Sequence, residues 1–209
     1  MPKVEPFEEY ASQYEGWFER NRFVYESELR AIREQLPEKG KGIEIGVGSG
    51  RFAAPLGIEM GVEPSRKMRE LAQKRGIRTI EGVAERLPFH NSQFEFALMV
   101  TTVCFVDDIQ DSFQEAYRIL KPGGCLIIGF IDRESSLGRL YQQHKKKSVF
   151  YKIATFYTVA EILLNLKKVG FKNFSLIQTI FHSLSKIKAI EPIKEGYGEG
   201  SFVVIKALK

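Results

Sequence analysis

Residues 42–50 constrain this chain more than any other segment. They read Gly-Ile-Glu-Ile-Gly-Val-Gly-Ser-Gly, a short apolar run with a carboxylate at Glu44, followed by glycines at alternate positions, Gly46, Gly48 and Gly50. An apolar run that ends in a glycine-rich turn is typical of the first strand of a parallel sheet, where the chain turns beside a nucleoside-containing ligand. The segment therefore predicts an α/β fold with a binding site at the end of its first strand.

The spacing of the glycines separates two kinds of ligand. A dinucleotide site has the pattern G-x-G-x-x-G and places an anionic pyrophosphate on a helix N-terminus. Here Arg51 stands where that pattern has its last glycine, and Glu44 places a negative charge beside the turn. A ligand with a sulfonium and an α-ammonium group suits this turn better than one with phosphates. A second carboxylate, Glu63, lies 19 residues after Glu44 and would accept hydrogen bonds from both ribose hydroxyls.

Further motifs follow the glycine turn in a fixed order. They are Val62-Glu63-Pro64-Ser65, Gly82-Val83-Ala84-Glu85-Arg86-Leu87-Pro88-Phe89, the apolar run 94–100, and Arg118-Ile119-Leu120-Lys121-Pro122-Gly123-Gly124. Together with the turn they resemble the class I S-adenosylmethionine-dependent methyltransferases, most closely the small-molecule, type 11 branch. The resemblance covers roughly residues 40–130.

Predicted strands and helices alternate through the first 130 residues, and two late strands follow. This order predicts a doubly wound, Rossmann-like α/β sheet with helices on both faces. The resemblance adds seven strands in the order 3-2-1-4-5-7-6, mostly parallel with an antiparallel last strand. The predicted strands are residues 42–45, 61–63, 77–80, 94–100, 125–131, 174–181 and 201–208.

The length of 209 residues fits one domain, so we expect a single methyltransferase domain over residues 1–209. Residues 7–36 are predicted to be helical with a break near Gly16, and residues 1–36 to form an N-terminal helical cap. Residues 133–157 are expected to form a helical insertion near the active site. The many aromatic side chains in residues 7–25 either pack the cap onto the domain or, as the resemblance implies, line the substrate pocket.

The resemblance assigns roles to individual residues. It gives Glu63 to the ribose hydroxyls, and the backbone of Ala84 with the side chain of Glu85 to the adenine edge. Val100 and Thr101 would face the methionine end. The full predicted cofactor-binding set is Glu44, Gly46, Val47, Gly48, Gly50, Glu63, Pro64, Ala84, Glu85, Val100 and Thr101.

The sequence selects no catalytic residue. Methyl transfer from an activated sulfonium is an in-line displacement that needs alignment and a dry cleft more than a conspicuous catalytic group. A general base is needed only if the acceptor loses a proton during attack. Tyr14, Tyr141 and His144 are conceivable bases, and nothing in their spacing chooses among them.

Other features of the sequence concern the cell compartment, the state of the cysteines and metal binding. The N-terminus lacks the apolar core of a signal peptide, and no apolar run approaches the length of a membrane span, so we expect a cytoplasmic protein with no membrane partner, either a monomer or a homodimer. Cys104 and Cys125 lie in apolar stretches and are expected to be reduced core thiols. Because no Cys/His cluster has the spacing of metal ligands, no metal is expected.

The favoured prediction is transfer of a methyl group from S-adenosylmethionine to an unidentified small-molecule acceptor, which leaves S-adenosylhomocysteine. The net charge of +5 keeps open an RNA or protein methyltransferase. After the fourth strand the chain has Thr101-Thr102-Val103-Cys104 rather than an Asn/Asp-Pro-Pro-Tyr/Phe motif, which argues against exocyclic nucleobase amines and glutamine amides. A non-catalytic S-adenosylmethionine-binding protein is a further alternative, as is a nicotinamide or flavin oxidoreductase, which Glu44 and Arg51 disfavour.

Overall fold

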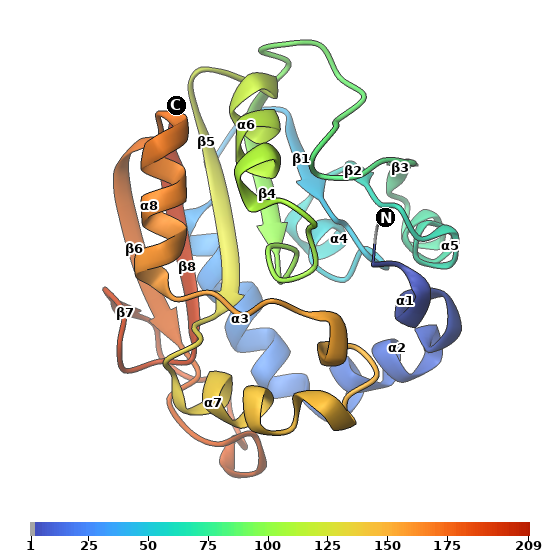
Figure 1. The fold of residues 1–209 in the computed structure, drawn as a ribbon, viewed down its shortest axis with the longest axis vertical. Helices are drawn as coiled ribbons and strands as arrows, with labels where there is room; N and C mark the ends of the chain where they lie inside the picture. The colour runs from blue at the N-terminus through green and yellow to red at the C-terminus, as the bar shows by residue number, and fades with distance from the viewer. Residues whose placement is uncertain (1–2) are drawn as a thin grey trace.

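The computed structural model describes residues 3–209, and within them eight strands form one mixed sheet in the order β3-β2-β1-β4-β5-β8-β6-β7 (Figure 1). The strands are β1 (Gly42–Ile45), β2 (Met60–Val62), β3 (Arg78–Ile80), β4 (Phe94–Val100), β5 (Leu120–Ile131), β6 (Lys172–Thr179), β7 (Lys194–Glu195) and β8 (Phe202–Leu208).

The strand order confirms the predicted fold class. β1 to β5 pair in parallel, and β8 lies antiparallel between β5 and β6. This is the order 3-2-1-4-5-7-6 with an antiparallel last strand, extended at one edge by β7. The sequence missed β7 because it consists of two exposed residues without an apolar alternation, paired only with β6.

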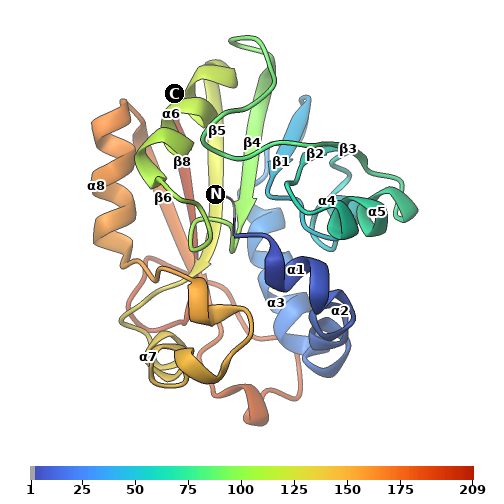
Figure 2. The same cartoon turned by 45° about the vertical axis from the view of Figure 1, so that its right-hand side comes forward.

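Helices cover both faces of the sheet (Figures 1 and 2). The apolar side chains of α6 and α8 share one buried cluster with the strands, and those of α3, α4 and α5 share another. The helices are α1 (Glu5–Glu9), α2 (Ala11–Arg20), α3 (Arg22–Gln35), α4 (Ala53–Leu56), α5 (Arg66–Lys74), α6 (Ile109–Ile119), α7 (Ser136–Gln143) and α8 (Val159–Val169), with 3₁₀ turns at Lys145–Lys147, Tyr151–Ile153 and Leu184–Lys186. None of the helices described is long and apolar enough to cross a bilayer.

Side-chain caps begin α5 and α6, two of the helices that follow parallel strands. Ser65 Oγ accepts a hydrogen bond from the Met68 amide at 3.2 Å and begins α5. Asp108 begins α6 by accepting from the amides of Gln110 and Asp111. Such a cap stabilises a helix by about 1 kcal/mol. The caps therefore fix where the chain leaves β2 and where α6 begins after the loop that follows β4.

The predicted break near Gly16 is wrong. The helical backbone is interrupted at Tyr10 and at Asn21, and Gly16 lies inside α2. Asn21 Nδ2 donates to the Trp17 carbonyl at 2.9 Å, a local bond that competes with helix continuation. At Gly16 an added Cβ would lie 2.8 Å from Arg20 Nη1, so the glycine gives room to that side chain.

The N-terminal helices and the segment around α7 lie at the end of the sheet toward which β1, β4 and β5 run (Figures 1 and 2). Aromatic contacts join the two segments there. The ring of Phe150 lies 5.4 Å from the ring of Phe7 and 6.0 Å from that of Tyr14. Residues far apart in the sequence thus meet beyond the carboxyl ends of the parallel strands, where ligands bind in sheets of this kind.

Candidate active site

A cleft opens at the carboxyl ends of β1, β2 and β4, and we call it the strand-end cleft. Three residues of the predicted set, Glu44, Val47 and Gly50, are buried behind its lining. The other eight line it: Gly46, Gly48, Glu63, Pro64, Ala84, Glu85, Val100 and Thr101.

The glycine turn brings bare backbone to the cleft. Gly46 has φ of +71°, and an added Cβ would lie 2.4 Å from Thr102 Cγ2. Thr102 Oγ1 is held 3.1 Å from the Ile45 carbonyl oxygen, so the end of β4 is tied to the end of β1. At Gly48, with φ of +53°, an added Cβ would lie 3.2 Å from the Tyr14 hydroxyl. Both positions need glycine, because a side chain would close the gap and strain the backbone.

Glu63 presents a fixed carboxylate to the cleft. Its Oε2 accepts from the Gly48 amide and its Oε1 from the Ser65 amide, both at 2.9 Å. The side chain is buried, which raises its pKa to about 7, and the two backbone donors partly offset this rise. One bond on each oxygen leaves acceptor capacity on both for a ligand.

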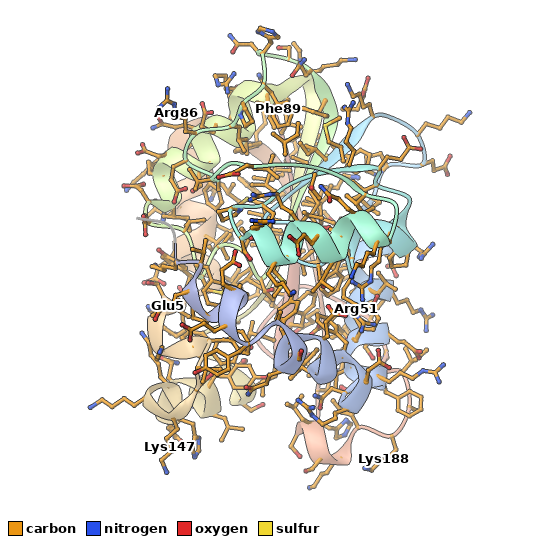
Figure 3. All side chains as sticks on the ribbon, turned by 90° about the vertical axis from the view of Figure 1, so that its right-hand side faces the viewer. Glu5, Arg51, Arg86, Phe89, Lys147 and Lys188 are labelled. Atoms are coloured by element: carbon orange, nitrogen blue, oxygen red, sulfur yellow. The ribbon has the colours of Figure 1, made fainter. Side chains whose placement is uncertain are left out.

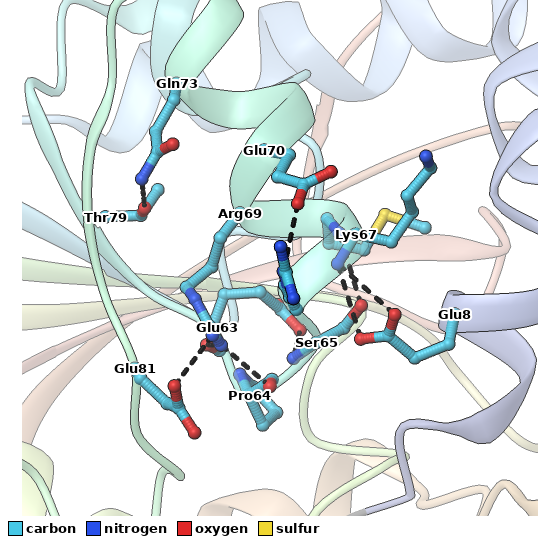
Figure 4. A network of polar contacts seen from close by, with 12 residues as sticks. Glu8, Glu63, Pro64, Ser65, Lys67, Arg69, Glu70, Gln73, Thr79 and Glu81 are labelled. Carbon is cyan, nitrogen blue, oxygen red and sulfur yellow. Dashed lines mark hydrogen bonds and ion pairs between the residues drawn. The ribbon is translucent and has the colours of Figure 1, made fainter.

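The turn that follows Glu63 is held from outside (Figure 4). Arg69 Nη1 donates to the carbonyl oxygens of Glu63 and Pro64, each at 2.8 Å. The Glu8 carboxylate accepts from the Lys67 amide at 3.3 Å, which links α1 to the first turn of α5. These contacts fix the turn that carries Glu63, just after β2, relative to the N-terminal helices.

Glu44 lies beneath the glycine turn with an exposed fraction of 1%. Burial raises the pKa of its carboxyl well above the usual range, the Ala53 amide offsets part of this, and the nearby Glu63 raises it further. Its Oε2 has no hydrogen-bond partner among the residues described. A cationic group above the turn would relieve this unpaired acceptor, whereas an anionic group would not.

Glu85 and Thr101 carry structural contacts that the sequence did not foresee. Glu85 Oε1 accepts from the Asp107 amide at 2.6 Å, so this side chain also holds the loop before α6. Thr101 has φ of +51°, rare for a β-branched residue, and its amide donates to the Gly129 carbonyl at 2.7 Å. Strain of this kind clusters at functional sites, and Thr101 lies where the cleft meets a second cavity.

That second cavity, which we call the aromatic cavity, has a volume of about 330 Å³. Phe7, Tyr14, Thr101 and Phe105 line both spaces, so the two are contiguous. The remaining lining of the aromatic cavity is Gln13, Trp17, Phe18, Arg20, Glu28, Phe52, Ile131, Tyr141, His144, Ser148, Phe150, Tyr151 and Leu184.

The three conceivable bases come together in this cavity without one being selected. Tyr14, Tyr141 and His144 all line it. Burial raises the pKa of both phenols, for Tyr14 with help from the Glu44 and Glu63 charges, so both keep their protons at neutral pH. A protonated phenol donates hydrogen bonds rather than removing protons.

Sequence reasoning missed Glu28 and Phe105. Phe105 follows β4 in a loop without a motif. Glu28 had a readable signal, because it falls in the buried stripe of α3 with Val24, Ala31 and Gln35. A carboxylate at an apolar position of an amphipathic helix is the kind of local conflict that marks functional residues.

Arg51, which stands in place of the dinucleotide glycine, fastens α2 to the glycine turn. Its Nε donates to Glu15 Oε2 at 3.0 Å and its Nη2 to Glu19 Oε1 at 2.8 Å. Arg75 from the end of α5 pairs with the same Glu15 carboxylate. Figure 3 looks onto this side of the molecule and labels Arg51.

Comparisons with known proteins agree with this geometry. A methyltransferase-domain family model matches residues 43–128. A solved structure from Thermotoga maritima, described as an S-adenosylmethionine-dependent methyltransferase and possible histamine N-methyltransferase, is 54% identical, covers 99% of both chains and superposes with a TM-score of 0.97.

Two further relatives were found by sequence. An uncharacterized protein of Methanocaldococcus jannaschii is 47% identical over 203 residues, which is 97% of this chain and 98% of that relative. The demethylmenaquinone methyltransferase of Chlorobaculum tepidum is 31% identical over 140 residues, covering 62% of this chain and 57% of the relative.

This chain therefore belongs to the class I S-adenosylmethionine-dependent methyltransferases, as the ordered motifs predicted. Within residues 3–209, no group of three or more His, Cys, Asp or Glu side chains is arranged to hold a metal ion. Cys104 and Cys125 form no disulfide, and burial raises the pKa of both thiols, that of Cys104 to about 12.

Proposed function

We propose that the chain transfers a methyl group from S-adenosylmethionine, bound in the strand-end cleft, to a small molecule held in the aromatic cavity. The observation that carries this proposal is the shared wall of the two spaces, formed by Phe7, Tyr14, Thr101 and Phe105. A donor in one space and an acceptor in the other would face each other at this junction.

The residues of the cleft fit the donor. Bound S-adenosylmethionine supplies a methyl group already activated on a sulfonium. Glu63 has free acceptor capacity for two ribose hydroxyls, and the bare backbone of Gly46 and Gly48 permits close approach. The unpaired Oε2 of Glu44 favours a ligand with positive charge. Ala84 would lie at the adenine edge.

The contribution of the protein to the reaction is alignment and exclusion of water. The rings of Phe7 and Phe105, with centroids 5.1 Å apart, present apolar surface at the junction. Holding two reactants in line is worth up to ~7–11 kcal/mol of the barrier. The absence of a selected base matches this task, because alignment needs no proton transfer.

Two observations favour a small acceptor over RNA or protein. The aromatic cavity is closed in by the N-terminal helices and the segment around α7, which suits a small molecule. The sequence has two short basic clusters, Lys145–Lys147 and Lys186 with Lys188. Their members Lys147 and Lys188 lie on opposite sides of the lower end of the molecule in Figure 3, rather than along one track. The Thermotoga maritima relative is described as a possible histamine N-methyltransferase, so amines are the first acceptors to test.

The test is formation of S-adenosylhomocysteine by the purified protein with S-adenosylmethionine and a panel of amines, phenols, quinols and total RNA. We expect release above the acceptor-free rate with at least one small molecule and none with RNA. Glu63→Ala should abolish the release, and the exposed Glu34→Gln should leave it unchanged. Donor binding without release on any acceptor would contradict catalysis and indicate a non-catalytic binding protein.

A further inference from the structure

We propose that the aromatic cavity takes an organic cation and that Glu28 binds its positive charge. This inference rests on the proposed function, because the cation would be the methyl acceptor. It makes Glu28 the residue that determines acceptor specificity and names the acceptor as an amine with an apolar or aromatic body.

Glu28 is a buried carboxyl group with no hydrogen-bond or ion-pair partner among residues 3–209. It comes from α3, lines the aromatic cavity and has an exposed fraction of 5%. None of the ion pairs among the residues described involves it. An unpaired carboxylate in such surroundings is costly, and a cationic ligand offsets that cost.

Aromatic side chains surround this carboxyl group with suitable chemistry. The hydroxyls of Tyr14, Tyr141 and Tyr151 lie near enough to Glu28 that an ionised carboxylate there would raise the pKa of all three phenols. The rings of Tyr141 and Tyr151 stack with centroids 4.5 Å apart. Ring faces attract cations, and phenol oxygens accept hydrogen bonds from an ammonium. The cavity thus offers a carboxylate, acceptor oxygens and π faces to one charge.

Within the described part of the chain, no Lys, Arg or His side chain forms an ion pair with Glu28. Arg20 and His144 line the cavity, yet both are exposed, and the pKa of Glu28 is raised to about 8 by burial with no cation opposing the rise. At neutral pH the free protein therefore holds this group mostly protonated. A bound ammonium would favour the ionised form, and binding would release a proton.

The position of Glu28 separates the charge from the reacting atom. Glu28 lines the aromatic cavity and not the strand-end cleft, whereas Tyr14 and Thr101 line both. An acceptor with its ammonium at Glu28 would extend a different atom, the nucleophile, toward the junction. The cavity therefore selects molecules that carry both groups.

The experiment is calorimetric titration at pH 7.0, where free Glu28 holds its proton, with and without saturating S-adenosylhomocysteine. The probes are 2-phenylethylamine, which is cationic, and 2-phenylethanol, its neutral analogue. The wild type should bind the amine at least tenfold more tightly than the alcohol and release protons on binding. Glu28→Gln and Glu28→Ala should reduce the preference below threefold with unchanged affinity for S-adenosylhomocysteine. Glu34→Gln, which removes an exposed carboxylate from the same helix, should keep it.

Two results would overturn the proposal: equal affinity of the wild type for the two probes, or an undiminished preference in the Glu28 variants. Thermal unfolding of each Glu28 variant, with a midpoint near that of the wild type, is the control for folding. Failure of S-adenosylhomocysteine to bind would instead contradict the proposed function. The titrations without that ligand then still decide whether Glu28 recognises the amine.

Discussion

The strand-end cleft and the aromatic cavity are built in different ways. In the cleft, backbone groups and ion pairs fix the ligand-facing residues, as with Glu63 between the amides of Gly48 and Ser65. In the aromatic cavity, rings rest on other rings and surround the unpaired carboxyl group of Glu28. The first arrangement is rigid and suits one invariable ligand. The second is set by side chains that can change without disturbing the sheet, and it suits the choice of an acceptor.

The largest effect should come from breaking the cleft at Glu63. Glu63→Ala removes both acceptor oxygens for the ribose, and hydrogen bonds to a charged group are worth about 1.5–3 kcal/mol each. We expect affinity for S-adenosylhomocysteine to fall by about 100-fold in calorimetry. Amine binding in the aromatic cavity should change little. A loss of less than threefold would place the ribose elsewhere.

A second effect concerns the free energy of unfolding of the protein, to which the buried Glu28 of the aromatic cavity contributes. The pKa of Glu28 is raised to about 8 by burial, so the native state holds its proton where the unfolded state has lost it. Stability therefore falls as pH rises through the window from about 4.5 to 8. Relative to the wild type, Glu28→Gln should gain stability by up to about 1.4 kcal/mol for each pH unit across this window, and it should have no advantage at pH 4.5, in urea denaturation. A difference independent of pH would contradict this origin.

A third effect is the pH dependence of donor binding, which tests the role of Glu63 in the strand-end cleft. Burial raises the pKa of Glu63 to about 7, and the ionised form is the one that accepts ribose hydroxyls. Affinity for S-adenosylhomocysteine should therefore rise about tenfold from pH 6 to pH 8 and then level off. Glu63→Gln should bind weakly with a flat profile. A flat profile in the wild type would show that Glu63 is already ionised at pH 6.

The smallest effect should come from loosening the join between α2 and the glycine turn. Arg51→Ala removes the contacts to Glu15 and Glu19, which are partly exposed, and should lower the melting temperature by about 2–4 °C. Donor affinity should fall by less than about fivefold. Arg66→Ala breaks the exposed pair with Glu70 and serves as the matched control with no measurable change.

The sequence was most informative where function depends on the backbone. Alternate glycines and a carboxylate after the second strand shape the turn, and the predicted residues Gly46, Gly48 and Glu63 line the cleft. The strand order came from the family resemblance that these motifs carry, and the structure confirms it. Glu44 and Gly50 belong to the motif as its support, since both are buried behind the lining.

The aromatic cavity could be predicted only in part. The sequence shows the aromatic residues in positions 7–25, but their assignment to a pocket needs the contacts of Phe7 and Tyr14 with Phe150 across the fold. Glu28 falls on the buried stripe of α3, but only the packing of the helix shows that its carboxyl group lines a cavity. Such pairings between distant segments have no periodic signature in the sequence.

The most direct test of donor recognition at the strand-end cleft is calorimetric titration of the wild-type protein with S-adenosylmethionine, S-adenosylhomocysteine and NADH. We expect micromolar binding of both sulfur ligands at one site per chain, and no binding of NADH. NADH binding without binding of either sulfur ligand would contradict the assignment of the glycine turn and its two carboxylates to a cationic nucleoside ligand.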